Sequence, residues 1–194
     1  MAETGVRKLR AAQTEAELKA AAVRVFARVG YLNAKITDIT AEAGRATGSF
    51  YQHFAGKEEL LRALMADLLA EGDESALLEE HSDDFSDREA IRWHIMQYWS
   101  VYRRHRTVIE ALRQAAIVDP HFDEVQREML RPDVVHLSHH MEKAGPSADP
   151  EVLASIFQLL VSTFADTWMD KIPDEQAIKT LTDFLYAGIR YRED

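Results

Sequence analysis

The sequence predicts an all-α fold, with a small N-terminal three-helix domain and a larger C-terminal helical bundle, on three observations. Apolar residues recur at helical spacing along most of the 194 residues. No sustained alternation of apolar and polar residues occurs, and the chain has no Asn-Gly or Asp-Gly turn. Helix start and stop signals divide the pattern into about nine helices, and the prolines fall between them except for Pro132.

The first three helices are expected within the first 54 residues. Thr14 and Glu17 have the spacing of a capping box, and Gly30 suits a helix end, so the first helix is expected over residues 14–30. Two short helices are expected over residues 36–43 and 47–54, with Gly44 supplying the turn between them. Two short helices that meet at a glycine turn and pack on a longer helix are typical of a helix-turn-helix domain.

The C-terminal helices have their own boundary signals. Ser86 with Glu89 suits a helix start, and Pro132 is expected to kink or split the helix that contains it. An acidic, weakly periodic stretch over residues 71–87 predicts the end of a connecting helix followed by a loop. A longer helix is expected to start near residue 57 and to end within that stretch, and the remaining helices are expected over residues 87–105, 108–118, 120–144, 150–171 and 174–191.

The charge is distributed unevenly along the chain. The net charge is −10, yet residues 1–62 carry ten Lys and Arg against seven Asp and Glu. A basic N-terminal domain on an acidic body is expected of a protein that meets phosphate groups at one end only. Ordinary variation in surface charge would give the same pattern.

Several classes of protein are not expected from the composition. There is no cysteine, which excludes disulfides and thiolate metal sites. We see no signal peptide and no apolar run of the roughly 18 residues that a membrane span needs, so a cytoplasmic protein without membrane contact is expected. No Glu-x-x-His pair, nucleophile turn or phosphate-binding glycine loop is found, so neither an enzyme nor a cofactor is expected.

Residues 36–61 resemble the DNA-binding signature of TetR-type repressors. The strongest match is the run from Gly48 to Phe54, Gly-Ser-Phe-Tyr-Gln-His-Phe, followed by Lys57-Glu58 and Leu60. The resemblance in motif covers about residues 14–65, and beyond residue 70 only length and helix order match. It implies a helix-turn-helix DNA-binding domain over residues 1–56 and a helical ligand-binding and dimerisation domain over residues 57–194.

The resemblance implies roles for individual residues. Tyr51 and Lys57 would contact phosphates of double-stranded DNA, whereas Thr47, Ser49 and Gln52 would face base edges. His53 is expected to hold its helix against its neighbours, and simple packing or solvation remains an alternative for Tyr51 and Lys57. The predicted DNA-binding set is Lys35, Arg45, Thr47, Gly48, Ser49, Tyr51, Gln52, His53 and Lys57.

Three positions depart from the family pattern. Arg45 replaces the usual Val after the turn glycine, and Lys35 stands where Thr is common. Both cations are candidates for phosphate contacts. Ala46 replaces a small polar cap, so Thr47 is expected to cap the second short helix one residue later.

Arg7, Lys8 and Arg10 precede the expected first helix. They could reach the minor groove as a basic arm. A disordered, solubilising tail is the alternative.

The last two helices carry more apolar residues than one buried stripe requires. The resemblance implies that they form a four-helix bundle across the two-fold axis of a homodimer, and a thick monomer core is the alternative. The predicted dimer residues are Ile156, Phe164, Leu181, Leu185 and Gly188.

Aromatic residues crowd the expected helix over residues 87–105 and suit either a ligand pocket or a core. The resemblance adds a cavity enclosed by the middle helices, which would bind a small-molecule effector that is largely apolar. The predicted pocket residues are Trp93, Met96, Trp99, Tyr102, Phe122, Val125, Met129 and Phe157.

These features predict a repressor that a small molecule releases from a palindromic operator. The alternative is a DNA-binding dimer without an effector, controlled by a protein partner or by its abundance. His136, His139 and His140 have a spacing that can chelate a metal. We expect a solvated or pocket-edge cluster there and no metal site.

Overall fold

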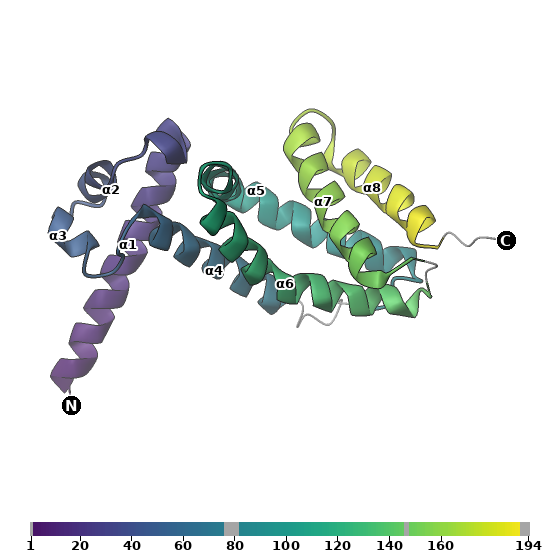
Figure 1. Ribbon diagram of the computed structural model, residues 1–194, viewed down its shortest axis with the longest axis horizontal. Helices are drawn as coiled ribbons and strands as arrows, with labels where there is room; N and C mark the ends of the chain where they lie inside the picture. The colour runs from purple at the N-terminus through teal and green to yellow at the C-terminus, as the bar shows by residue number, and fades with distance from the viewer. Residues whose placement is uncertain (1, 76–81, 146–147, 191–194) are drawn as a thin grey trace. The chain divides into compact units, whose positions relative to one another are not determined.

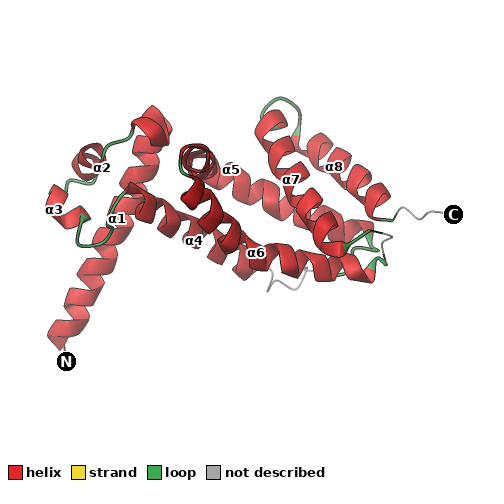
Figure 2. Cartoon of the chain, in the orientation of Figure 1, coloured by secondary structure: helices red, strands yellow, loops and turns green. Residues whose placement is uncertain are grey.

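The computed structural model describes residues 2–75, 82–145 and 148–190, which form eight α-helices and no strand (Figure 2). The all-α prediction is confirmed. The predicted end of the last helix at residue 191 and part of the acidic stretch lie outside the described residues. The helices are α1 (Ala2–Asn33), α2 (Ile36–Glu42), α3 (Thr47–Phe50), α4 (Lys57–Ser75), α5 (Arg88–Val118), α6 (Pro120–Lys143), α7 (Pro150–Trp168) and α8 (Asp174–Ile189).

The chain divides into two compact units. The first contains the residues up to Leu69 together with His105–Gln126, and the second contains Ala70–Arg104 together with the chain from Arg127 onward. The first unit therefore holds α1 to α3 with parts of α4, α5 and α6. The boundary after residue 56 separates two expected functions, whereas the two compact units are defined by how the helices pack. The domain boundary therefore stays a prediction.

The helix α1 begins at Ala2 and not at Thr14, so Arg7 and Arg10 lie inside a helix (Figure 1). The expected capping box does not form. The Thr14 hydroxyl donates back to the Arg10 carbonyl at 3.0 Å, while the Glu17 carboxylate pairs with Arg45. Residues 6–13 are mostly Ala, Leu, Arg, Lys and Gln, which favour helix and extend it past the cap signal.

The turn between α2 and α3 forms as expected. Gly44 has a φ of 64°, a left-handed conformation that glycine adopts without strain. The Gly44 N–H donates to the Ala41 carbonyl at 3.1 Å, and the Arg45 N–H donates to the Thr40 carbonyl at 2.9 Å. This pair of hydrogen bonds is the Schellman arrangement, which satisfies the last carbonyls of α2 and sets the direction of α3.

The helix α3 is shorter than expected and starts without a side-chain cap. Its α-helical part ends at Phe50 and continues as hydrogen-bonded turns to Phe54. The N-cap residue is Ala46, which makes no side-chain hydrogen bond, so the expectation that Thr47 takes over the cap is wrong. The Thr47 hydroxyl lies instead 3.4 Å from the Thr40 hydroxyl.

The helices expected over residues 87–105 and 108–118 form the single helix α5, with a non-helical kink at His105 (φ −111°, ψ 17°). The chain has neither proline nor glycine over residues 105–108, so the helix continues through the expected break. The start of α5 is capped by Asp87 and not by Ser86, because the Asp87 carboxylate accepts the Glu89 N–H at 2.9 Å.

Pro132 does not split α6, which runs through it from Pro120 to Lys143. Proline removes the hydrogen bond to the carbonyl four residues earlier, that of Glu128. Both Pro132 and Glu128 are exposed, so water can satisfy that carbonyl.

Each unit has its own apolar core. In the first unit, Leu18, Val25, Ile39, Phe50 and Leu60 are buried. Burial of such side chains stabilises the fold by about 1.5–3 kcal/mol each before opposing entropy is counted. The core of the second unit contains Phe85, Ile91, Ile95, Trp99, Tyr102, Phe157, Val161, Leu181 and Leu185.

In the part of the chain that is described, no helix is both long and apolar enough to cross a membrane.

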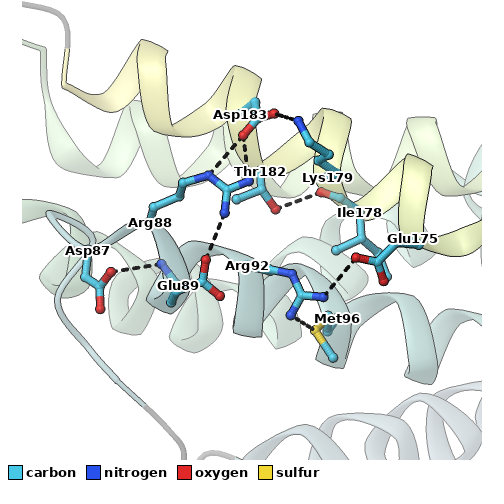
Figure 3. Close-up of polar contacts among 10 residues, drawn as sticks. All are labelled: Asp87, Arg88, Glu89, Arg92, Met96, Glu175, Ile178, Lys179, Thr182 and Asp183. Atoms are coloured by element: carbon cyan, nitrogen blue, oxygen red, sulfur yellow. Dashed lines mark hydrogen bonds and ion pairs between the residues drawn. The ribbon is translucent and has the colours of Figure 1, made fainter.

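Ion pairs fasten α8 to α5 in the second unit (Figure 3). The Arg88 guanidinium contacts the Asp183 carboxylate at 2.6 Å, and Arg92 lies 3.5 Å from Glu175. The hydrogen bonds from Lys179 and Arg88 hold the pKa of the Asp183 carboxyl below its ordinary value. These contacts fix the face of α8 that packs on α5.

Candidate nucleic-acid interface

The helix α3 has a buried face and a polar face. Phe50 and Phe54 are buried, with ring centroids 5.6 Å apart, and attach α3 to the core of the first unit. Thr47, Gly48 and Gln52 are exposed on the other side, and Ser49 is half-buried. A polar face carried by an anchored short helix is what entry into a major groove requires.

Tyr51 combines an anchored ring with a free tip. Its ring packs edge-on against Phe50 with centroids 5.6 Å apart, yet the residue is 57% exposed. No residue that the structure describes accepts a hydrogen bond from its hydroxyl. The ring is therefore positioned while the hydroxyl remains available to a ligand such as a phosphate oxygen.

Gly48 lies on the exposed face of α3 without crowding. A Cβ built at this position would meet no other atom of the chain within 4 Å. The fold of the isolated protein therefore does not require glycine here. A requirement for glycine at this position would therefore have to come from a molecule that binds against this face.

Arg45 and Lys35 differ in their availability to phosphate. The Arg45 Nε donates to the Glu17 carboxylate at 2.9 Å, and this pairing holds the pKa of the Glu17 carboxyl below its ordinary value. Lys35 is exposed and has no ion pair within the described ranges. Its backbone N–H donates to the Asp38 carboxylate at 3.2 Å at the start of α2.

Lys57 is bound to the end of α1. Its ammonium donates to the carbonyl of Tyr31 at 2.8 Å and to that of Ala34 at 3.1 Å, and it lies 4.3 Å from the centre of the Tyr31 ring. Partial burial lowers the pKa of Lys57, against a smaller opposing effect of Glu58. An ammonium has three N–H donors, so one donor remains for a phosphate.

His53 packs against α1, as expected. Its side chain is only 12% exposed, and its Nδ1 lies 4.0 Å from the Glu15 carboxylate. Thus His53 helps to join the end of α3 to α1, and its place in the DNA-binding set stays a prediction.

Sequence reasoning missed the role of Gln114 in positioning the domain. Its side-chain Oε1 accepts the N–H of Tyr31 at 2.9 Å, just after Gly30, which has a φ of 75°. The same oxygen lies 3.3 Å from the position of a Cβ on Gly30. No local signal could have identified Gln114, because its partner lies 83 positions away.

The predicted pocket residues fall into both units. Phe122 and Val125 belong to the first, and the other six belong to the second. Tyr102, Phe122 and Phe157 are buried, whereas Trp93, Val125 and Met129 are partly exposed. Met96 is 37% exposed, and its Sδ accepts a hydrogen bond from Arg92 at 3.0 Å (Figure 3).

Trp99 has the most informative environment of this set. It is only 3% exposed, and its ring lies 6.5 Å from that of Phe164. Its Nε1 is buried with no hydrogen-bond partner among the described residues. A buried donor without an acceptor is costly, and an acceptor atom on a water molecule or a ligand would satisfy it.

The predicted dimer residues divide by burial. Leu181 and Leu185 are buried within the protomer, whereas Ile156 and Gly188 are exposed and Phe164 is partly exposed. Further large apolar side chains that sequence reasoning left out are exposed on the same two helices. They are Val152, Leu159, Leu160, Trp168 and Phe184.

The histidines lie in an aromatic cluster. The His140 ring is 4.5 Å from that of His136 and 5.0 Å from that of His94, whereas His139 is exposed. The described ranges contain no group of three or more His, Asp or Glu side chains that could hold a metal.

Comparison with known proteins identifies the N-terminal domain. Residues 18–64 match the family described as bacterial regulatory proteins of the tetR family. The chain is 31% identical over 93 residues to the HTH-type transcriptional regulator TtgR of Pseudomonas putida. That match covers 48% of this chain and 44% of TtgR, so the chain spans less than half the length of this relative.

Solved structures share the fold over nearly the whole chain. A TetR-family transcriptional regulator from Syntrophomonas wolfei superposes with a TM-score of 0.73 at 20% identity, covering 91% of this chain and 95% of that one. The fatty acid degradation regulator FadR from Bacillus halodurans gives a TM-score of 0.73 at 19% identity, covering 92% and 97%. The predicted arrangement of an N-terminal helix-turn-helix and a helical C-terminal part is confirmed by this likeness.

Proposed function

We propose that this chain, whose residues 18–64 match the bacterial regulatory proteins of the tetR family, is a transcriptional regulator that binds a palindromic operator as a homodimer. The observation that carries the proposal is the polar, exposed face of α3, anchored by the buried rings of Phe50 and Phe54. A helix that is already ordered can enter a major groove without a further loss of conformational entropy on binding.

Contacts to bases and to phosphates are divided over the domain. Gln52 can pair bidentately with adenine, and Thr47 and Ser49 offer hydroxyls to base edges. Tyr51 can donate its free hydroxyl to a phosphate, and Lys57 can use its remaining donor beside the N-terminus of α4. The phosphate contacts orient the domain, and the base contacts select the sequence.

The exposed apolar side chains of α7 and α8 support a homodimer. Leu159 is 66% exposed and Phe184 is 65% exposed on helices that otherwise bury apolar surface. Several large apolar side chains exposed on two consecutive helices favour an interface with another molecule. A two-fold symmetric dimer also suits operator binding, because two recognition helices about 34–36 Å apart meet successive major grooves.

A buried donor supports release by a small molecule. The indole N–H of Trp99, in a region of buried aromatic rings, suits an effector that is largely apolar and carries a hydrogen-bond acceptor. Binding would favour the conformation with the wrong spacing of recognition helices. A coupling free energy of about 1–3 kcal/mol would lower operator affinity 5- to 150-fold.

Selection from a randomised duplex library tests the DNA-binding function directly. We expect enrichment of one palindrome, bound by two protomers, with an affinity that falls steeply with salt. Sedimentation of the complex gives the stoichiometry. The function is refuted if no sequence is enriched and binding to random duplex is also absent.

The homodimer and the effector need separate tests. Leu159→Asp with Phe184→Asp is expected to yield monomers by sedimentation, whereas Lys171→Asp, which alters an exposed residue in the turn before α8, is expected to leave the dimer intact. Release is tested by screening compounds against the operator complex. An effector that dissociates the wild-type complex but acts much more weakly on Trp99→Phe would support the role of the indole N–H.

A further inference from the structure

We propose that the N-terminal turns of α1 form a second DNA contact that binds the phosphate backbone beside the recognition helix. We call Arg7, Lys8 and Arg10 the basic turn. The inference rests on the proposed DNA-binding function and adds a site that lies outside the helix-turn-helix motif. It replaces both earlier expectations for these residues, the disordered tail and the minor-groove arm.

The basic turn is fully available to an anion. Residues 6–13 are exposed, and residues 6–14 contain no Asp or Glu. Within the described ranges, none of the three cations of the basic turn forms an ion pair. A helical segment that presents three exposed cations and contains no Asp or Glu of its own has a local positive potential that attracts phosphate.

Other cations of the same unit are largely neutralised by carboxylates. Lys19 lies 2.9 Å from Asp67, and Arg24 lies 2.7 Å from Glu42. Arg28 shares Glu42 at 3.3 Å. These cations contact carboxylates of the same chain. The cations of the basic turn have no such carboxylate within the described ranges, so their charge is available to a ligand.

The position of the basic turn relative to α3 follows from contacts within the first unit. Glu15 and Glu17 of α1 lie against His53 and Arg45, which flank α3. Arg10 and Arg7 are five and eight residues further toward the N-terminus, which is about 8 to 12 Å along the axis at 1.5 Å per residue. Figure 1 shows α1 continuing in this direction past α2 and α3.

This displacement is of the same order as a few phosphate steps along a DNA strand. Phosphates of one strand recur about every 3.4 Å along the duplex axis, so 8 to 12 Å corresponds to about two to four steps. Arg7 and Arg10 are three residues apart and share one face of α1. They can therefore contact neighbouring phosphates that flank the segment occupied by α3.

The helical conformation decides between phosphate and minor groove. An α-helix with its side chains is about 10–12 Å across, whereas the minor groove is about 6 Å wide. A helical arm cannot enter such a groove as an extended arm does. The basic turn is thus expected to raise affinity for every duplex sequence and to add no base preference.

The salt dependence of operator affinity tests the proposal. The variant Arg7→Ala/Arg10→Ala removes two cations from each protomer and four from the dimer, so the slope of log K against log salt is expected to become shallower by about 3.6. Preference among library sequences should not change. Arg7→Lys/Arg10→Lys keeps the charges and should keep the wild-type slope.

The matched control is Arg131→Ala/Lys171→Ala, which removes two exposed cations from the second unit. It should leave the slope as in the wild type. An unchanged slope in the Arg7/Arg10 variant, or an equal loss in the control, would overturn the proposal while leaving the DNA-binding function intact. Loss of binding to anionic lipid vesicles alone would assign the basic turn to a membrane surface. If the wild type binds no duplex at all, both this inference and the proposed function fail.

Discussion

The guanidinium of Arg45 donates two hydrogen bonds to one carboxylate oxygen of Glu17, one of them from Nε at 2.9 Å. The pair joins the turn before α3 to α1. It also neutralises the cation that stands closest to the start of the recognition helix in sequence. Arg45 therefore stabilises the arrangement of helices at the expense of its own attraction for phosphate.

Removing the partner is expected to release Arg45 toward DNA. In Glu17→Gln, the guanidinium loses its counter-charge, so one new phosphate contact in each protomer of the dimer should make the salt slope steeper by about 1.8 and tighten binding to all duplexes. Measurement is by operator affinity at several salt concentrations. Glu15→Gln removes the same charge within one turn of Glu17, and an equal change in that control would mean that only net charge matters.

The same pair predicts a dependence of stability on pH. Pairing with Arg45 lowers the pKa of the Glu17 carboxyl below its ordinary value of 4.5. A lowered pKa means that the folded state favours the charged form, so this contribution is present above about pH 4.5 and is lost as the pH falls further. Urea unfolding of the wild type and of Glu17→Gln should differ at pH 7 and converge under acid conditions. A difference that does not shrink between pH 7 and pH 3 would contradict the assignment.

Tyr51→Phe is expected to weaken binding to operator and to random duplex by the same factor. The substitution deletes only the hydroxyl, since the ring keeps its packing on Phe50. A net hydrogen bond to a charged group contributes about 1.5–3 kcal/mol. Parallel affinity titrations with both duplexes measure the effect. A loss confined to the operator would mean that Tyr51 contacts a base.

Gln52→Ala is expected to reduce sequence preference more than overall affinity. A good bidentate contact to a base discriminates by about 1–3 kcal/mol. The measurement is a repeated library selection with the variant, in which one position of each half-site should become degenerate. Unchanged preference at every position would remove Gln52 from the base-contacting face.

Ala46→Ser is expected to stabilise the domain. Ala46 is the N-cap of α3 and makes no side-chain hydrogen bond, whereas a serine hydroxyl can accept an N–H of the first turn. The gain in the free energy of unfolding should be about 0.5–2 kcal/mol by urea titration. Ala41→Ser places a hydroxyl on an exposed position inside α2 and should give no gain. Equal stabilisation by both variants would exclude capping as the cause.

Local patterns in the sequence determined much of this protein. The Gly44 turn and the helix starts at residues 120 and 150 depend on residues within one or two turns of each other. Capping, glycine conformation and helical periodicity act over that range, so each could be predicted from neighbouring residues. The same locality explains why the motif over residues 36–61 was sufficient to indicate DNA binding.

Tertiary structure decided what the local patterns could not. The Glu17 carboxylate pairs with Arg45, which is distant in sequence, and therefore does not form the capping box with Thr14. In the same way, the Lys57 ammonium donates to the carbonyl of Tyr31. Burial of Leu181 and Leu185 depends on which face of α8 meets α5, a choice fixed by distant partners such as Arg88 and Asp183. A helical pattern shows that a face is apolar, but only packing shows which molecule covers it.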